Sequence, residues 1–254
     1  MPRYKLIIEY DGTPYAGWQR QTDQPTVQEA LMNAVFLFSG QRVDVIGAGR
    51  TDASVHATAQ VAHIEIDMDV EGFKVMQGIN YYLFNPPPES TYPTNRIAIL
   101  DAQRVGDDFH ARFSAKRRHY LYRIINRRPR LGLEAGKAWH VIDDLDEKAM
   151  QEAAKILVGH HDFSSFRDTR CQSKSAEKTL EIFNVTRRNN EIHIIASARS
   201  FLHHQVRNMV GTLSLVGKGK WSASDVKTAL EAKDRRAGGP TCPPEGLYLT
   251  GVDY

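Results

Sequence analysis

The sequence is poor in the features that mark secreted, membrane-bound and metal-binding proteins. Its two cysteines, Cys171 and Cys242, lie far apart and form no Cys-x-x-Cys spacing, which argues against a zinc site or a disulfide framework. The N-terminal apolar run is too short for a signal peptide, and no segment approaches the ~18 apolar residues of a membrane span. We therefore expect a cytoplasmic protein with no membrane partner and no metal.

The chain also lacks a large excess of charge of either sign. The net charge is only +3, so total charge favours no class of partner, and the distribution of charge is more informative. The hydrophobic content of 41% and the charged content of 25% are ordinary for a globular protein. With 254 residues, the chain is long enough for one large or two medium domains with real cores.

Hydrophobic patterns predict the same order of helices and strands twice along the chain. The first half has predicted strands at 4–10, 43–46, 59–66 and 96–105, and helices at 27–38 and 71–82. The second has strands at 119–126, 181–187, 191–198 and 247–253, and helices at 145–158, 201–216 and an inserted 223–232. Each half reads β-α-β-β-α-β, which is the ferredoxin-like order.

This order predicts an α+β fold made of two ferredoxin-like halves, residues 1–106 and 107–254. We expect the halves to join edge to edge into one extended antiparallel sheet, with helices packed on one face. The central cleft between them is the expected substrate site. Two helix starts carry a capping-box pattern, Thr26 with Glu29 and Asp144 with Glu147.

The segment from Gly47 to Ala57 holds one carboxylate, Asp52, among small residues and directly after a short apolar run. Arg50 lies shortly before it and His56 shortly after it. The pattern suits a turn, in which Asp bonds its local backbone, about as well as a catalytic site. A dinucleotide fingerprint is excluded because Asp52 occupies its third glycine position, and a Walker loop is excluded because Gly-Lys-Ser/Thr is missing.

Residues 109–133 contain no acidic side chain but many basic ones. The basic residues are Arg112, Lys116, Arg117, Arg118, Arg123, Arg127, Arg128 and Arg130. Tyr120 and Tyr122 would share one face of a strand there. Clustered cations attract a phosphate backbone, and aromatic rings can stack on an unpaired base. A solvated basic loop beside two core tyrosines explains this window equally well, but arginine pairs at 167/170, 187/188 and 235/236 shift the balance towards a nucleic acid.

The predicted helix at 201–216 places His203, Arg207 and Gly211 on one face, with His204 beside them. Along that face the cationic residues are followed by Gly211, whose lack of a side chain would let a partner approach closely. Two adjacent histidines point about 100° apart on a helix, and no His-Glu-x-x-His pattern is present, so a metal site is improbable.

Taken in order, these segments resemble the tRNA pseudouridine synthase A family. The matching stretches are 10–21, 26–28, 49–57, 109–115, 161–163, 201–211 and 246–249, and they span the chain from end to end. Each stretch is weakly specific, whereas the ordered set is very specific. One departure is visible, because the family usually has Gly where this chain has Ser54; we expect the turn to persist with a slightly altered backbone.

The resemblance implies an enzyme that isomerises uridine to pseudouridine at positions 38, 39 and 40 of tRNA, in the anticodon stem-loop, without a cofactor. It implies that Asp52 is the catalytic nucleophile or base, that Tyr120 packs on the target base and that Arg207 pairs with Asp52. Whether Asp52 attacks C1′, adds to C6 or removes the C2′ proton stays open. Because the base leaves an electron-poor sugar, a carboxylate is chemically suited to this place.

By the same resemblance and from the basic pattern, further residues are expected to bind the substrate. They are Arg50, His56, Arg117, Arg118, His203, His204 and Leu247. The expected partners are the anticodon arm of tRNA and a second copy of the chain in a homodimer. A non-catalytic RNA-binding or RNA-folding protein on the same scaffold is the alternative, although it predicts the loss of Asp52, Tyr120 or Arg207, and all three are present.

Overall fold

A computed structural model describes residues 1–88, 90 and 92–254 of the chain. The chain forms two compact units, unit 1 (Met1–Lys116 and Tyr248–Tyr254) and unit 2 (Arg117–Leu247). Each unit combines helices with mostly antiparallel strands, so the predicted α+β class is confirmed.

The boundaries of the units differ from the expected division at residue 106 for a physical reason. The loop after the fourth strand stays with unit 1, where the Lys116 N–H donates to the Asp253 carbonyl at 2.8 Å. The last strand also returns to unit 1, because Tyr248 pairs with His56.

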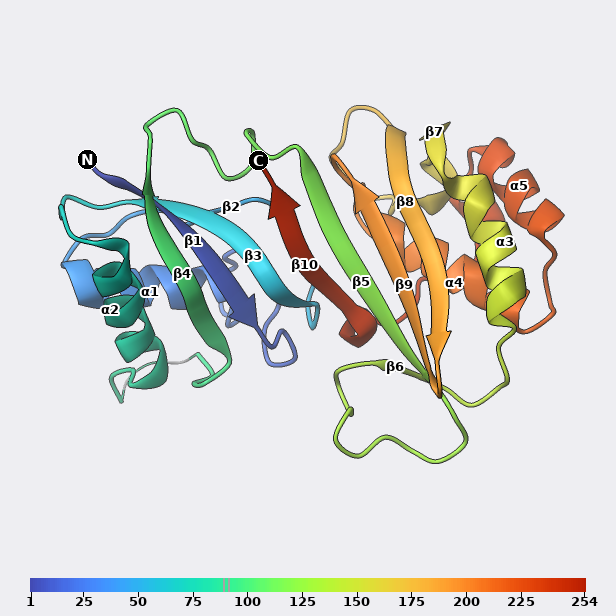
Figure 1. Ribbon diagram of the computed structural model, residues 1–254, viewed down its shortest axis with the longest axis horizontal. Coiled ribbons are helices and arrows are strands. Elements are labelled where there is room, and N and C mark those ends of the chain that lie inside the picture. Colours follow the sequence, from blue (N-terminus) through green and yellow to red (C-terminus); the bar gives the residue numbers. More distant parts are fainter. Residues whose placement is uncertain (89, 91) are drawn as a thin grey trace. The chain divides into compact units, whose positions relative to one another are not determined.

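Unit 1 contains the predicted β-α-β-β-α-β order (Figure 1). Its elements are β1 (Arg3–Tyr10), α1 (Val27–Ser39), β2 (Ile46–Gly47), β3 (His56–Glu65), α2 (Gly72–Phe84) and β4 (Ile97–Val105). Strand β1 lies between β3 and β4 and is antiparallel to both, and β2 pairs with β3. The final strand, β10 (Leu247–Asp253), pairs with β3 in parallel.

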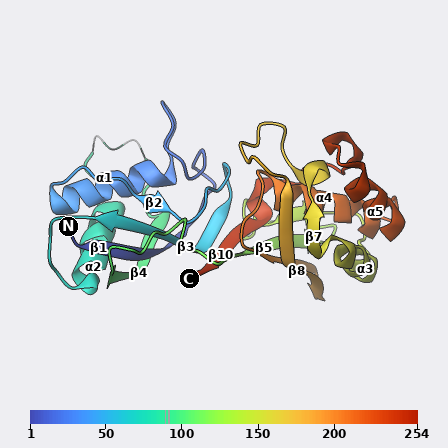
Figure 2. The same ribbon diagram turned by 90° about the horizontal axis from the view of Figure 1, so that it is seen from above.

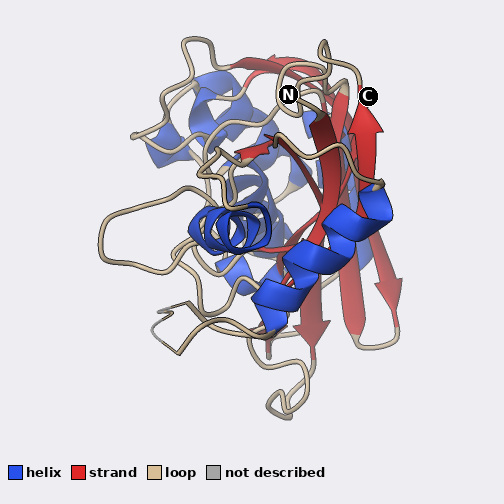
Figure 3. Ribbon diagram, turned by 90° about the vertical axis from the view of Figure 1, so that its left-hand side faces the viewer, coloured by secondary structure: helices blue, strands red, loops and turns tan. Residues whose placement is uncertain are grey.

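The core of unit 1 follows from the alternation of side chains along β1. Tyr4, Leu6 and Ile8 are fully buried, whereas the residues between them are partly exposed, as expected for a sheet covered on one face. Figure 2 shows α1 across that sheet. Helix α2 lies against β4, where the Asn80 side chain bonds both the N–H and the C=O of Ile99, and in Figure 3 a helix crosses in front of the strands on this side.

Unit 2 contains the remaining strands and helices. They are β5 (Arg117–Asn126), β6 (Trp139–Val141), α3 (Glu147–Leu157), β7 (Gly159–Asp162), β8 (Glu177–Arg188), β9 (Glu191–Ala198), α4 (Gln205–Gly217) and α5 (Ala223–Ala232). The antiparallel order is β5-β9-β8-β7, and β6 pairs with β5 in parallel. The short strands β6 and β7 were not predicted, because three or four residues are too few to display an alternating pattern.

Two predicted helix starts in unit 2 were wrong. Helix α3 is capped by Asp146, which accepts from the Ala149 N–H at 3.0 Å, and not by Asp144. Helix α4 begins at Gln205 because His204 has a left-handed backbone with φ of 62°, so residues 201–204 are not helical. No helix in the part of the chain that the structure describes is long and apolar enough to cross a bilayer.

Candidate active site

Asp52 lies in the short connection between β2 and β3. The Val55 N–H donates to the Asp52 carbonyl at 3.2 Å, and Ser54 adopts a left-handed φ of 61°. Thr51 and Val55 on either side are buried, whereas the Asp52 side chain is half-buried. The two interpretations of this motif, a turn or a site, are therefore compatible, because the segment is a tight turn that presents a carboxylate.

The segment 10–18 supports this turn from within unit 1. The Trp18 N–H donates to the Thr51 carbonyl at 3.0 Å, and the Ser54 N–H donates to the Tyr15 carbonyl at 3.3 Å. Gly17 has a φ of 106°, and a Cβ there would lie 2.7 Å from the Thr51 carbonyl oxygen. Two stretches that are well separated in sequence, 10–21 and 49–57, thus form one structure around Asp52.

Arg50 and His56, which flank Asp52 in sequence, have different environments. Arg50 is exposed. His56 is only 2% exposed; its Nδ1 accepts from the Gly12 N–H at 3.0 Å, and its ring stacks on Tyr248 at 4.7 Å. These contacts give His56 a structural role, because it fixes the chain at Gly12 to strands β3 and β10.

Asp11, next to Gly12, has an Oδ1 atom 3.3 Å from His56 Nδ1. Burial alone would raise the pKa of Asp11, but hydrogen bonds from Thr13 and the charge of Arg96 outweigh it and lower the pKa. Since Nδ1 already accepts from Gly12, a neutral His56 cannot also donate to Asp11 from the same nitrogen. We regard the Gly12 hydrogen bond as the determining contact.

Tyr120 belongs to β5 in unit 2 and faces the same side as Tyr122, as predicted. Its ring lies 5.1 Å from that of Phe201 at an interplanar angle of 89°, and the residue is 9% exposed. Tyr122 is fully buried and donates to the Pro243 carbonyl at 2.7 Å; burial raises its pKa well above the usual value. Tyr120 is thus packed against Phe201, on the same face of β5 as the fully buried Tyr122.

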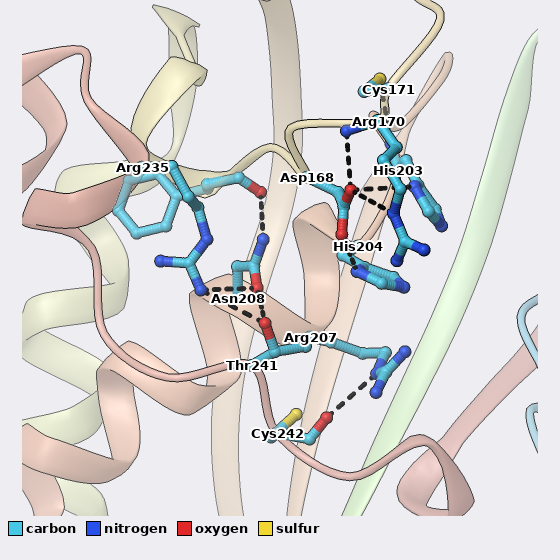
Figure 4. A network of polar contacts seen from close by, with 11 residues as sticks. Asp168, Arg170, Cys171, His203, His204, Arg207, Asn208, Arg235, Thr241 and Cys242 are labelled. Carbon is cyan, nitrogen blue, oxygen red and sulfur yellow. Dashed lines mark hydrogen bonds and ion pairs between the residues drawn. The ribbon is translucent and has the colours of Figure 1, made fainter.

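Close to α4, His203 and His204 share one carboxylate, that of Asp168 (Figure 4). Asp168 Oδ2 lies 2.8 Å from His204 Nδ1, and the two imidazole rings lie 3.9 Å apart. Burial opposes ionisation of Asp168, but hydrogen bonds from Arg170 and the nearby histidines lower its pKa. Sequence reasoning missed Asp168, although an acidic residue between Arg167 and Arg170 was a visible signal.

The prediction that His203, Arg207 and Gly211 share a helix face was wrong for His203, which precedes α4. Arg207 is on the helix, and its Nε donates to the Cys242 carbonyl at 3.0 Å (Figure 4). A Cβ on Gly211 would lie 1.8 Å from the Pro240 carbonyl oxygen. The narrow part of α4 therefore accommodates the chain's own segment 240–242, which in turn orients Arg207.

Many arginines of the basic segments bond other parts of unit 2. Arg117 Nε donates to Glu181 at 2.6 Å, and an Arg118 nitrogen donates to the Arg199 carbonyl at 2.5 Å. Three further arginines donate hydrogen bonds within unit 2: Arg123 to Glu191, Arg187 to Asn126 and Leu145, and Arg235 to Asn208. The exposed basic side chains of these segments are Arg112, Lys116, Arg128, Arg130, Arg170, Arg187, Arg188 and Arg236, of which Arg170 pairs with Asp168 and Arg236 with Asp234.

Leu247 is 6% exposed and begins β10. The preceding residue, Gly246, lies so close to β5 that a Cβ there would be 2.7 Å from the Tyr122 ring. Gly246 is therefore packed directly against the Tyr122 ring of β5.

Comparison with known proteins places the chain among RNA-modifying enzymes. The family model described as tRNA pseudouridine synthase matches residues 6–114 and 153–254, and the chain belongs to this family. The chain is 54% identical to tRNA pseudouridine synthase A of Maricaulis maris over 254 residues, which are 100% of this chain and 98% of that protein. The proteins of the same name from Afipia carboxidovorans and Xanthobacter autotrophicus are 53% and 55% identical, with 100% of each chain covered.

Proposed function

We propose that the protein isomerises uridine to pseudouridine at positions 38, 39 and 40, in the anticodon stem-loop of tRNA. In this reaction the bond between N1 of the base and C1′ of the ribose breaks, the base rotates, and a bond between C5 and C1′ forms. The proton leaves C5 and a proton is gained at N1, so no atom is added and no oxidant or reductant is needed. The reaction requires no cofactor.

The observation that carries the proposal is Asp52, a half-buried carboxylate in a turn held by Trp18 and Tyr15. Breaking the glycosidic bond leaves positive character at the sugar, and a carboxylate can stabilise or capture it. A turn fixed by hydrogen bonds keeps the carboxylate in position, which lowers the entropic cost of reaching the reactive geometry.

Tyr120 and Arg207 are proposed to act with Asp52. Tyr120 stacks on the extruded base, a role that suits an aromatic ring. Arg207 pairs with the Asp52 carboxylate and keeps it ionised, and the Cys242 carbonyl helps to orient its guanidinium group.

Binding of the tRNA is proposed to involve Arg50, Arg118, His203 and His204, together with the exposed basic residues of unit 2. Arg117 contributes less, because it is paired with Glu181. His56 and Leu247 are both buried, so their proposed role is to support the site and not to contact the tRNA directly. The proposed enzyme acts as a cytoplasmic homodimer, which sedimentation of the purified protein tests.

The experiment is to map pseudouridine in unmodified tRNA that has been incubated with purified protein and no cofactor. The wild-type protein should form pseudouridine in the anticodon arm, and Asp52→Asn should form none while it retains most of its tRNA affinity. Asp44→Asn is the matched control, because Asp44 is an exposed carboxylate in the same unit, and it should behave as wild type. Near-normal conversion by Asp52→Asn would refute the assignment, and tRNA binding without conversion by the wild-type protein would favour the non-catalytic alternative.

A further inference from the structure

The loop that follows β4 presents an aromatic side chain to solvent. Phe113 is 73% exposed, whereas its neighbour Ala111 is fully buried. An exposed phenyl ring contributes little hydrophobic stabilisation to the fold. It can serve as a binding surface if hydrogen bonds hold its loop in one conformation.

The loop is closed by its own side chains. His110 Nδ1 accepts from the N–H groups of Arg112 at 3.1 Å and Phe113 at 3.2 Å. Ser114 Oγ accepts from the His110 N–H at 3.0 Å, and the Ser114 N–H donates to the His110 carbonyl at 2.9 Å. These bonds fix the backbone on both sides of Phe113.

The same loop is anchored in the core of unit 1. The Ala111 N–H donates to Nδ1 of the buried His63 at 3.1 Å, and the Ala111 carbonyl accepts from the Tyr254 hydroxyl at 2.8 Å. Ala111 also packs with Ala48 and Val61 in one small apolar cluster. Since Ala48 belongs to the connection that carries Asp52, the Phe113 loop is packed directly against the segment that leads to Asp52.

One cationic group and a second ring lie beside the exposed ring. The Arg112 guanidinium carbon lies 5.6 Å from the centre of the Phe113 ring, and the His110 ring lies 4.4 Å from it at 33°. Lys116, at the end of the loop, is exposed, whereas the acidic residues Asp107 and Asp108 precede it. An aromatic face beside cations is the combination that proteins use to bind unpaired nucleotides, the ring for the base and the cations for the phosphate.

We propose that Phe113 stacks on an unpaired tRNA nucleotide that neighbours the target uridine, and that Arg112 contacts the adjacent phosphate. This inference rests on the proposed function. When a uridine is extruded, the bases beside it lose a stacking partner, and a fixed phenyl ring on the loop that packs against the Asp52 connection replaces that partner. Because the ring is held in advance, little entropy is lost on binding.

The test measures the dissociation constant of unmodified tRNA, and KM, for a series of variants at Phe113. Phe113→Ala should raise both about 5- to 150-fold, the range of one base–aromatic stack, with kcat at saturating tRNA changed far less. Phe113→Tyr should stay close to wild type, and Phe113→Leu, which keeps apolar bulk without a ring, should resemble Phe113→Ala. Arg112→Ala should reduce the salt dependence of binding.

Phe73→Ala is the matched control, because Phe73 is another phenylalanine of unit 1 that is 59% exposed, and it should leave tRNA affinity unchanged. Wild-type affinity for Phe113→Ala would overturn the inference, and so would equal affinities for the Tyr and Leu variants, which would indicate simple apolar contact. The two proposals fail separately: absence of pseudouridine with the wild-type protein counts against the enzyme, whereas the Phe113 series is decided by binding alone.

Discussion

The carboxylate of Asp168 lies 2.8 Å from Nδ1 of His204, the residue that caps the start of α4. His204 adopts a left-handed backbone, which costs a residue other than glycine roughly 1–2 kcal/mol. The Asp168 N–H also donates to the His203 carbonyl at 3.0 Å, so one residue holds both the backbone and the side chains of this turn. Arg207 lies on the first turn of the helix that this contact positions.

We therefore expect Asp168→Ala to lower kcat about 10- to 100-fold through displacement of the start of α4, because small errors in position are costly in a preorganised site. Asp168→Asn should recover much of the loss, since its amide oxygen still accepts from Nδ1. Glu152→Ala, which removes an exposed carboxylate paired with Lys155 on α3, is the control and should leave kcat unchanged. Steady-state kinetics, measured together with thermal unfolding of each variant, distinguishes a loss of positioning from a loss of stability. Equal losses of kcat in the Ala and Asn variants would contradict the positioning role of Asp168.

Gly17 offers a test of the link between the N-terminal motif and Asp52. Its φ of 106° is unfavourable for other residues, and an added Cβ would lie 2.7 Å from the Thr51 carbonyl oxygen. Gly17→Ala should lower the free energy of unfolding by more than about 1 kcal/mol and should reduce activity, because the Asp52 turn must shift. Gly49→Ala is the control, because its added Cβ would meet nothing within 4 Å. Its free energy of unfolding, measured in urea, should be close to that of the wild type.

The elements of the fold were largely predictable, because most of them carry a long periodic pattern. Strand β1 alternates between buried and partly exposed residues over its whole length, and α1 is followed at its C-terminus by Gly40, which has a left-handed φ of 73°. Strands β6 and β7 were missed because they are short and are defined only by their pairing with β5 and β8. The assignment of β10 to unit 1 depends on its pairing with β3, which no local pattern encodes.

Within the candidate site, sequence reasoning identified the residue types better than their surroundings. It found Asp52 but could not separate the buried His56 from the exposed Arg50, because both lie in the same short motif. It treated Arg117 as a phosphate ligand, whereas Glu181, distant in sequence, already pairs with it. Such pairings depend on strand register, and periodicity alone does not determine the register between distant strands.

Ser54 stands where the resemblance to the family implies glycine, and its backbone has a conformation that favours glycine. Its φ of 61° lies in the left-handed region, where a side chain is unfavourable. The Ser54 hydroxyl lies 3.4 Å from the Thr13 carbonyl and compensates only weakly. Ser54→Gly should therefore change the free energy of unfolding by no more than about 1 kcal/mol, towards stabilisation, and should preserve activity. Clear destabilisation in urea unfolding would mean that the hydroxyl contact is worth more than the strain.

His63 should make the stability of the protein depend on pH between 5 and 7. It is 3% exposed, and burial, together with the charges of His110 and Arg3, lowers its pKa to about 4. Its Nδ1 must stay unprotonated, because it accepts from the Ala111 N–H. The unfolded chain binds a proton at His63 with a pKa of about 6.5, so acid favours the unfolded state over this range.

The contribution of His63 is thus fully present above pH of about 6.5 and is lost as the pH falls towards 4. Between pH 7 and pH 5 it should remove on the order of 2 kcal/mol from the free energy of unfolding. His63→Asn keeps a hydrogen-bond acceptor without the titration, so its unfolding free energy should vary less with pH over this interval. His160→Asn, at an exposed histidine, should retain the wild-type slope. Equal slopes for His63→Asn and wild type in urea unfolding at pH 5, 6 and 7 would show that another group dominates.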